Sequence, residues 1–463
     1  MDQVGHTRVA MGIHPYHFSW TLEQGESFET PEVIMAYSAE GFGKLSRIYH
    51  DAYRSNLIRS KYTEQPRPIL VNNWEATYFD FDADKIYHIA EEAKNIGLDM
   101  FVLDDGWFGK RDDSTSSLGD WYPNEEKLKG TLKELAEKIN AKGLKFGLWI
   151  EPEMTNKDSD LYRAHPDWLL AEQGKRICHS RTQYVLDFSK KEVREYIGDM
   201  LENLLAEVPV SYIKWDMNRT FSEVFSNGND REYQGKVCHK YILGVYELYE
   251  RLTSRFPHVL FESCASGGAR FDPGMLYYAP QGWTSDDTDA IERLKIQYGT
   301  SMVYPVSCMG SHVSASPNHQ TNRVTPIETR ADVAYFGTFG YELDLLKLDE
   351  EDKAEIRRQI AFMKEKRDLI QKGTFYRLKS PFEGNETAWM IVSEDQKKAL
   401  VGYYRVMQPV NVGFKRLKLK GLKEDICYKV SGYDYDCYGD ELMQVGMILS
   451  DSASGVWKKG VND

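Results

Sequence analysis

The strongest constraint on the fold is a regular alternation of short apolar runs and amphipathic helical stretches between residues 66 and 372. In one such stretch, apolar side chains from Ile86 to Ile96 recur at helical spacing, and Gly97 ends it. Alternation over about 300 residues indicates parallel strands joined by helical crossovers, and eight such units close a TIM barrel. The competing open sheet is disfavoured because the glycine fingerprint expected after its first strand is missing.

Nine apolar runs are candidates for barrel strands, one more than the barrel needs. We expect strands at 69–74, 100–103, 145–150, 184–188, 211–215, 259–263, 279–283, 302–306 and 334–339. The run at 184–188 is the weakest candidate, because it follows a long irregular stretch.

The regions before and after the predicted barrel do not show this alternation of apolar runs and amphipathic helices. Residues 1–65 start with alternating, aromatic-rich segments at 9–20 and 33–37 and continue in a helix-like stretch, which predicts a short β region and a linker helix. After a helix expected at 348–372, residues 373–463 read as an antiparallel β-sandwich. Its expected strands lie at 387–392, 399–405, 408–412 and 426–430. The predicted domains are therefore 1–65, 66–372 and 373–463.

Composition excludes several classes of function. The chain has 58 Lys and Arg against 71 Asp and Glu, a net charge of −13, which argues against broad binding to nucleic acid or anionic membranes. No apolar run approaches the ~20 residues that span a bilayer, and the first residues do not resemble a signal peptide. The six cysteines are scattered without zinc-type spacing, so we expect a cytoplasmic protein without a metal or other cofactor. His312 and His319 fit core or solvent roles better than catalytic ones.

Polar, acidic and aromatic side chains follow the predicted strands, where the active sites of TIM barrels lie. These endings are NNWE (72–75), DDGW (104–107), WIEPE (149–153), KWDMNR (214–219), ESCASGGAR (262–270) and WTSDDTD (283–289). Many carboxylates beside tryptophans indicate glycoside chemistry, which needs one carboxyl as acid and a second as nucleophile or base. We expect Lys214 to keep its neighbour Asp216 ionised.

Taken singly, these residues also have simpler interpretations. An Asp after a strand, such as Asp286, is often a helix N-cap. The pair Asp104-Asp105 could cap a helix or bind a divalent metal, as in a phosphatase. Trp149 could belong to the core, and Cys264 could be an inert small residue. Their shared position at one rim is what favours a functional site.

Six motifs resemble the bacterial α-galactosidases of glycoside hydrolase family 36. They are LDDGWFG (103–109), LWIEPEM (148–154), IKWDMNR (213–219), ESCASGGARFD (262–272), WTSDDTD (283–289) and SHVSASPNHQTNR (311–323). The similarity runs from about Met11 to the end of the expected C-terminal sandwich. The family's barrel has eight strands, which makes 184–188 a loop segment leading into a helix. Family members carry a large β-sandwich before the barrel, and we expect residues 1–65 to hold only a remnant of it.

The resemblance implies retaining, metal-free hydrolysis of terminal α-linked galactose from melibiose- or raffinose-type sugars. It assigns Asp216 as the nucleophile and Asp286 as the acid/base. The motif positions that match the family's substrate-binding residues are Trp74, Asp104, Asp105, Trp149, Arg181, Lys214, Asn218, Cys264 and Gly267. Among them, the two aspartates match the pair that holds the O4 and O6 hydroxyls, and Cys264 with Gly267 matches the loop near the 2-hydroxyl.

Other functions stay open. The same motifs also resemble those of α-N-acetylgalactosaminidases and of galactosyl transferases of the raffinose-synthase kind. The loop that begins at Cys264 leaves little room for a 2-acetamido group, which favours galactose over N-acetylgalactosamine. A catalytically inactive galactoside-binding protein is an alternative of another class. The expected partner is an α-galactoside rather than nucleic acid or membrane. A homo-oligomer is also expected, weakened or altered by the missing β-sandwich.

Overall fold

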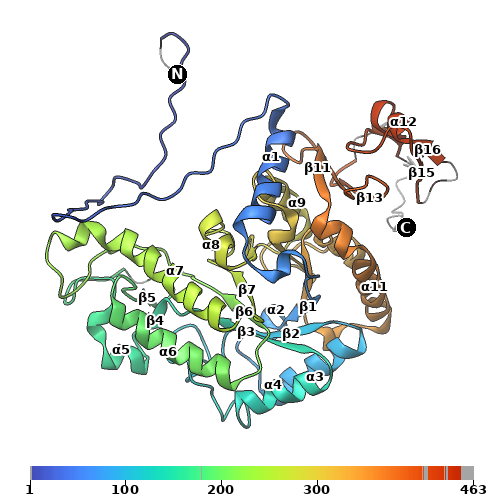
Figure 1. Cartoon of the computed structure of the whole chain (residues 1–463). Coiled ribbons are helices and arrows are strands. Elements are labelled where there is room, and N and C mark those ends of the chain that lie inside the picture. The colour runs from blue at the N-terminus through green and yellow to red at the C-terminus, as the bar shows by residue number, and fades with distance from the viewer. Residues whose placement is uncertain are drawn as a thin grey trace.

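The structure is a computed structural model, and it describes residues 3–178, 180–408, 410, 415–431, 433 and 436–449. Its centre is a closed barrel of parallel strands in the order β1-β10-β9-β8-β7-β6-β3-β2 (Figure 1). Leu70 pairs with Gly340 on one side and with Met100 on the other, which closes the ring. The strands are β1 (Leu70–Asn72), β2 (Met100–Leu103), β3 (Lys145–Ile150), β6 (Tyr212–Trp215), β7 (Leu260–Ser263), β8 (Gln281–Trp283), β9 (Met309–Ser314) and β10 (Thr338–Glu342). The predicted TIM barrel is confirmed.

Helices surround the barrel and begin at side chains that satisfy their free N–H groups. Thr131 and Glu134 form a capping box at α4, and Asp82 and Asp289 cap α3 and α9. The helices are α1 (Gly41–Ala52), α2 (Trp74–Thr77), α3 (Ala83–Asn95), α4 (Leu132–Ala141), α5 (Asp160–Ala164), α6 (Lys191–Glu207), α7 (Val237–Arg255), α8 (Pro273–Tyr278), α9 (Ala290–Thr300), α10 (Ile327–Ala334), α11 (Glu350–Lys372) and α12 (Gly439–Gln444). None of the described helices is long and apolar enough to cross a membrane.

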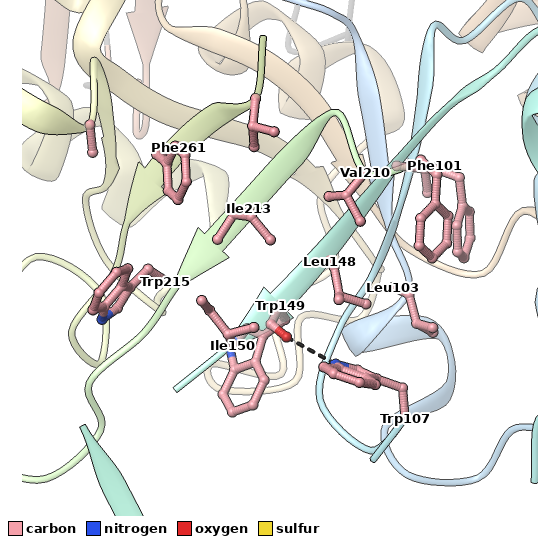
Figure 2. Packing of buried hydrophobic residues seen from close by; sticks show 14 of the residues in the cluster. Phe101, Leu103, Trp107, Leu148, Trp149, Ile150, Val210, Ile213, Trp215 and Phe261 are labelled. Atoms are coloured by element: carbon pink, nitrogen blue, oxygen red, sulfur yellow. Dashed lines mark hydrogen bonds between the residues drawn. The ribbon is translucent and has the colours of Figure 1, made fainter. Parts of the chain in front are cut away.

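Side chains alternate between the two sides of the barrel wall. Figure 2 shows part of the main buried cluster, in which outward-facing side chains of β2, β3, β6 and β7 pack together near Trp107 and Trp149. The Trp107 indole donates a 2.9 Å hydrogen bond to the carbonyl oxygen of Trp149. The alternate residues form a separate buried cluster that includes Tyr212 and Leu260. Because strand side chains alternate with a period of two, the inward series on β6 continues from Tyr212 through Lys214 to Asp216.

Two of the nine predicted strands have the wrong position in the sequence. The run at 302–306 is not a strand; it forms turns around Pro305, which lacks the N–H that a central strand needs. The strand is β9, seven residues later, whose polar side chains are all buried. The run at 334–339 overlaps the end of α10, and β10 starts at Thr338.

The surplus run at 184–188 lies outside the barrel. Its first residues belong to β5 (Gln183–Val185), which pairs antiparallel with β4 (Met154–Asn156). The chain then leads into α6. The interpretation of this run as a segment outside the barrel is confirmed, although it contains a short strand.

The predicted β region in residues 1–65 is wrong for the part that the structure describes. Residues 3–40 form turns and extended chain without strands, and this segment runs away from the barrel as the dark blue trace of Figure 1. A strand needs a neighbour for its N–H and C=O groups, and the segment finds few, such as Ser19 N to Gly235 O at 3.1 Å. Trp20 and Phe28 pack instead around His239 of α7.

The C-terminal region is antiparallel, as predicted. A three-stranded sheet contains β11 (Thr374–Lys379), β12 (Glu386–Val392) and β13 (Ala399–Arg405), and two small sheets pair β14 (Arg416–Leu417) with β17 (Met447–Ile448) and β15 (Cys427–Lys429) with β16 (Asp436–Tyr438). Trp389 and Ile391 of β12 face the barrel core, whereas Ala388, Met390 and Val392 join a small second core. The sheet therefore packs on both faces. The strand expected at 408–412 lies largely outside the described residues.

Candidate active site

The inward side chains at the C-terminal ends of the strands form the candidate site. Lys214 pairs in register with Trp149 on one neighbouring strand and with Glu262 on the other, so these side chains share the interior of the barrel. The loops that follow the strands add Asp216 and Asp286. The structure thus gathers residues predicted from widely separated motifs at one end of the barrel.

The carboxylate of Asp216 is buried and is the centre of a set of N–H donors. Its Oδ2 accepts hydrogen bonds from Asn218 Nδ2 at 2.7 Å and from Trp149 Nε1 at 3.2 Å. Its Oδ1 accepts from the backbone N–H groups of Met217 at 2.8 Å and Ser266 at 3.4 Å. Such donors suit an anionic carboxylate and fix the direction of its oxygens.

Lys214 has a different direct partner from the one expected. Its Nζ lies 3.0 Å from Asp104 Oδ2, and both side chains are buried. Burial alone would lower the pKa of Lys214, but the charge of Asp104 holds that pKa well above its ordinary value. The expectation that Lys214 acts chiefly on Asp216 is corrected, because its ion pair is with Asp104 and Asp216 is held by N–H donors.

Asp104 and Asp105 are both held by cationic side chains. Arg111 donates from Nε and Nη2 to the two oxygens of Asp105, each at 2.8 Å. Asn72 adds a 2.6 Å hydrogen bond to Asp104. The pair does not cap a helix, and a neutralised pair is poorly suited to a divalent metal. Within the described ranges, no cluster of three or more His, Cys, Asp or Glu side chains is placed to hold a metal ion.

One tight loop touches both proposed catalytic aspartates. Ser266 N donates to Asp216, and a Cβ added to the adjacent Gly267 would lie 2.7 Å from the backbone nitrogen of Asp286. Gly267 has φ +81°, so this position favours glycine for its conformation as well as its space. Cys264 is buried beneath the loop, and burial followed by the charge of Asp216 raises the pKa of its thiol.

Asp286 remains accessible to solvent at the mouth of the barrel. Partial burial is the first cause that raises its pKa, and the negative charge of Asp216 is the second. The N-cap interpretation of this residue is wrong, because Asp289 is the residue that caps α9. Asp286 is therefore an accessible carboxyl that protonates more readily than an ordinary aspartate.

The remaining predicted residues line the same end of the barrel or its edge. Trp149 is buried in an aromatic cluster and also donates to Asp216, so it belongs to the core and contacts the candidate site, and its role as a wall of the sugar pocket stays a prediction. Trp74 is half-buried at the start of α2, edge-on to Tyr78 and Phe79. Arg181 is exposed, and its Nη1 lies 3.5 Å from Ser266 Oγ.

Several buried residues at the site were missed by reasoning from the sequence. Glu151 accepts hydrogen bonds from Asn218 N and, at 2.7 Å, from Gln183 Nε2. Burial and then the charge of Asp216 raise the pKa of Glu151 to about 8. Glu153 accepts two hydrogen bonds from Arg270. The motif WIEPE contains both glutamates, but their hydrogen-bond partners are distant in the sequence and could not be predicted from it.

Known proteins are similar to this chain in sequence and in architecture. The family model for melibiase matches residues 27–373, and the model for the glycosyl hydrolase family 36 C-terminal domain matches residues 386–458. Alpha-galactosidase AgaA of Geobacillus stearothermophilus is 53% identical over 99% of this chain and 63% of that protein. Alpha-galactosidase Mel36A of Lactobacillus acidophilus is 48% identical over 96% of this chain and 61% of that protein.

Solved structures agree with these sequence matches. The crystal structure of AgaA superposes with a TM-score of 0.94 at 53% identity, covering 96% of this chain and 62% of that one. The alpha-galactosidase from Lactobacillus brevis gives a TM-score of 0.95 at 46% identity, covering 97% and 61%. The chain thus spans about three fifths of the length of these relatives.

Proposed function

Since this chain belongs to glycoside hydrolase family 36, the family of the melibiases, we propose that it is a retaining exo-α-galactosidase acting on melibiose- and raffinose-type sugars. The observation that carries the proposal is the pair of unlike aspartates in contact with one loop. Asp216 is buried among N–H donors, whereas Asp286 is accessible and has a raised pKa. Retaining glycoside hydrolysis needs this division between an anionic nucleophile and a proton donor.

The mechanism has two displacements. Asp216 attacks the anomeric carbon while Asp286 transfers its proton to the departing glycosidic oxygen, which leaves a galactosyl ester on Asp216. Water then attacks the same carbon, Asp286 accepts its proton, and the ester bond to Asp216 breaks. The product keeps the configuration of the substrate because each displacement inverts it once.

The pocket floor accounts for the proposed choice of sugar. Asp104 and Asp105 place carboxylate oxygens inside the barrel, held by Lys214 and Arg111, and they are proposed to accept hydrogen bonds from the O4 and O6 hydroxyls. Trp74 and Trp149 are proposed as aromatic walls and Cys264 with Gly267 as the loop near the 2-hydroxyl. Arg181 and Asn218 are proposed as further polar contacts to the substrate. Solved structures of AgaA variants with raffinose and with stachyose support this substrate class.

Three further proposals concern the location, the self-association and the domain division of the chain. All six cysteines are unpaired, which is typical of a reducing compartment and supports a cytoplasmic location. Exposed apolar side chains along residues 4–37 offer surface for contact with a second copy, including Val9, Met11, Tyr16, Met35 and Tyr37. The proposed division is 1–65, 66–372 and 373–463; the separate C-terminal core and the family matches at 27–373 and 386–458 support its second boundary, near residue 373. Light scattering of the purified chain tests the self-association.

Hydrolysis of paired nitrophenyl glycosides tests the proposed function. The chain should cleave the α-galactoside much faster than its N-acetyl-α-galactosaminide counterpart, and the Asp216→Ala variant should be inactive on both. Preference for the N-acetyl sugar would support the aminidase instead. Binding of galactose without hydrolysis by the unaltered chain would contradict the enzymatic proposal.

A further inference from the structure

A buried glutamate beside the pocket is not used by the mechanism above. Glu75 follows the proposed pocket wall Trp74 in the short helix α2, and its side chain is only 3% exposed. Its Oε1 accepts a 2.8 Å hydrogen bond from Thr288 Oγ1 and lies 3.3 Å from His319 Nδ1. Its Oε2 lies 3.4 Å from the backbone nitrogen of Ala315. A carboxylate buried this deeply requires partners of this kind.

The partners of Glu75 surround the loop that carries Asp286. Thr288 is two residues beyond Asp286, and its Oγ1 also accepts a 3.0 Å hydrogen bond from Asn318 Nδ2. Gln320 Nε2 donates at 2.9 Å to the backbone carbonyl of Asp286 itself. Glu75 therefore joins α2 to two segments, 286–288 and 315–320, that are held together at the residue proposed as acid/base.

The Asp286 loop is supported from two sides. Gly267 contacts its backbone on one side, and the network of Glu75, Thr288 and Gln320 holds it on the other. Because the Asp286 side chain is exposed to solvent, the position of its carboxyl depends on where this backbone is held. A shift of about 1 Å in a catalytic group can cost about a hundredfold in rate.

We propose that Glu75 is a positioning residue for the acid/base function of Asp286, acting through Thr288 and the 315–320 segment. The inference rests on the proposed function, since it needs Asp286 to transfer a proton to the leaving group. Glu75 itself does not touch the reacting atoms. Its place beside Trp74 links the wall of the sugar pocket to the placement of the acid.

The demand for a proton depends on the leaving group, which gives the proposal a distinctive signature. A dinitrophenolate leaves without help, whereas the sugar alkoxide released from melibiose needs protonation as the bond breaks. Loss of acid placement should therefore slow melibiose hydrolysis more than cleavage of dinitrophenyl α-galactoside. A residue with only a structural role would slow both reactions by the same factor.

The experiment compares these two substrates in the full chain and its variants. Glu75→Gln keeps the shape of the side chain but replaces one acceptor oxygen by a donor, and Thr288→Val removes the hydroxyl that joins the two segments. The matched control is Asp187→Asn, a buried carboxylate that accepts hydrogen bonds from the Ser189 and Ser226 hydroxyls and has no hydrogen bond to residues 286–288 or 315–320 in the part of the chain that the structure describes. Thermal unfolding of each variant verifies that it folds.

The expected result for both variants is a loss of about tenfold or more in kcat/KM on melibiose, with less than about threefold on the dinitrophenyl substrate. The double variant should lose less than the product of the single losses, because the residues act in one network. Azide should accelerate turnover of the dinitrophenyl substrate in the variants, since it needs no general base. The control should leave the ratio of the two activities unchanged.

Equal losses on both substrates, or no loss on either, would overturn the inference while the wild-type chain still hydrolyses melibiose. An unaltered chain that hydrolyses neither substrate would overturn the proposed function instead. The two failures are therefore distinguishable. If Glu75→Gln unfolds, the Thr288→Val variant tests the same contact.

Discussion

At the residue scale, the hydrogen bonds to Asp216 explain how one carboxylate among many is held for attack. Trp149 supplies an indole N–H from β3, while Asn218 and two backbone N–H groups come from the loops after β6 and β7. Two of the donors, Met217 N and Asn218 Nδ2, follow Asp216 directly, whereas Trp149 and Ser266 are distant in sequence. The position of the carboxylate therefore depends on the local motif and on the assembled end of the barrel.

Substitution of Trp149 tests the contribution of one of these donors. Trp149→Phe removes the N–H at 3.2 Å from Asp216 and should lower kcat/KM by about 10- to 100-fold, as expected for a hydrogen bond to a charged group. The matched control is Trp121→Phe. The Trp121 ring lies 6.3 Å from that of Trp149, and its Nε1 has no hydrogen-bond partner within the described chain. Equal losses in the two variants would contradict a role for the Trp149 N–H.

The raised pKa of Asp286 predicts the alkaline limb of the pH profile. The acid must be protonated for the first displacement, so kcat/KM should fall as pH rises through the pKa of Asp286, above the range of an ordinary aspartate. In the Asp216→Asn variant the second cause of the shift is gone, and the pKa of Asp286 should fall. Carbon-13 NMR titration of the carboxyls measures this change. An unchanged or higher pKa would mean that the two groups do not interact.

At the element scale, the loop after β7 connects the nucleophile to the acid/base. Gly267 is packed so closely that a Cβ would lie 2.6 Å from Ser285 Cα. Gly299, in α9, has nothing within 4 Å of the equivalent added atom. The two glycines are therefore a natural pair for comparison.

Gly267→Ala should displace the Asp286 segment, with a loss of stability of about 1–3 kcal/mol from the strained φ and a drop in kcat on melibiose of about a hundredfold. Gly299→Ala should be neutral or stabilise α9 by up to about 1 kcal/mol, because alanine favours helix. Urea unfolding and steady-state kinetics measure both effects. Full activity in Gly267→Ala would refute the tight contact.

The sequence predicts most elements of the barrel but not the strands that contain many polar residues. Apolar periodicity locates the first six barrel strands, since their residues pack on both sides of the wall. It misses β9, in which Ser311, His312 and Ser314 are polar and buried on the two sides of the barrel wall. The ion pairs of Asp104 with Lys214 and of Asp105 with Arg111 could not be predicted either. The motif after a strand shows that an aspartate is present, but it does not show which cationic side chain lies opposite it.

For residues 3–40 the prediction of strands is wrong for the opposite reason: the pattern of a strand is present, but the pairing is not. The alternating aromatic residues of this segment satisfy the pattern of a strand, but pairing requires a second strand at the right place. In the described chain, its contacts are scattered, such as the Ser19–Gly235 backbone hydrogen bond and the ring contacts around His239. Apolar alternation alone therefore predicts a strand even where no neighbouring strand is available to pair with it.

At the scale of the whole molecule, the C-terminal sheet is fixed to the barrel by the apolar face of β12, and a charged cluster holds its opposite end. Glu386 of β12 accepts hydrogen bonds from Lys379 of β11 and Tyr403 of β13, each at 2.8 Å, and from Lys415. Burial opposes ionisation, but these hydrogen bonds lower the pKa of Glu386 from 4.5 to about 2. The ionised form therefore stabilises the fold.

The stabilisation by Glu386 should depend on pH. Its contribution is fully present above about pH 4.5 and is lost as pH falls toward about 2, because the folded state then takes up a proton that the unfolded state already holds. Glu386→Gln should lower the free energy of unfolding by about 2–3 kcal/mol at pH 7, and the difference from wild type should shrink below pH 4.5. A difference independent of pH would contradict the assignment.

The central claim is that Asp216 and Asp286 act on the same anomeric carbon in two successive displacements. Proton NMR of the reaction with an α-galactoside, recorded before the product mutarotates, identifies the first galactose anomer that is formed. With two displacements, α-galactose should be the first anomer formed. First formation of β-galactose would show a single displacement and would contradict the assignment of Asp216 as a nucleophile.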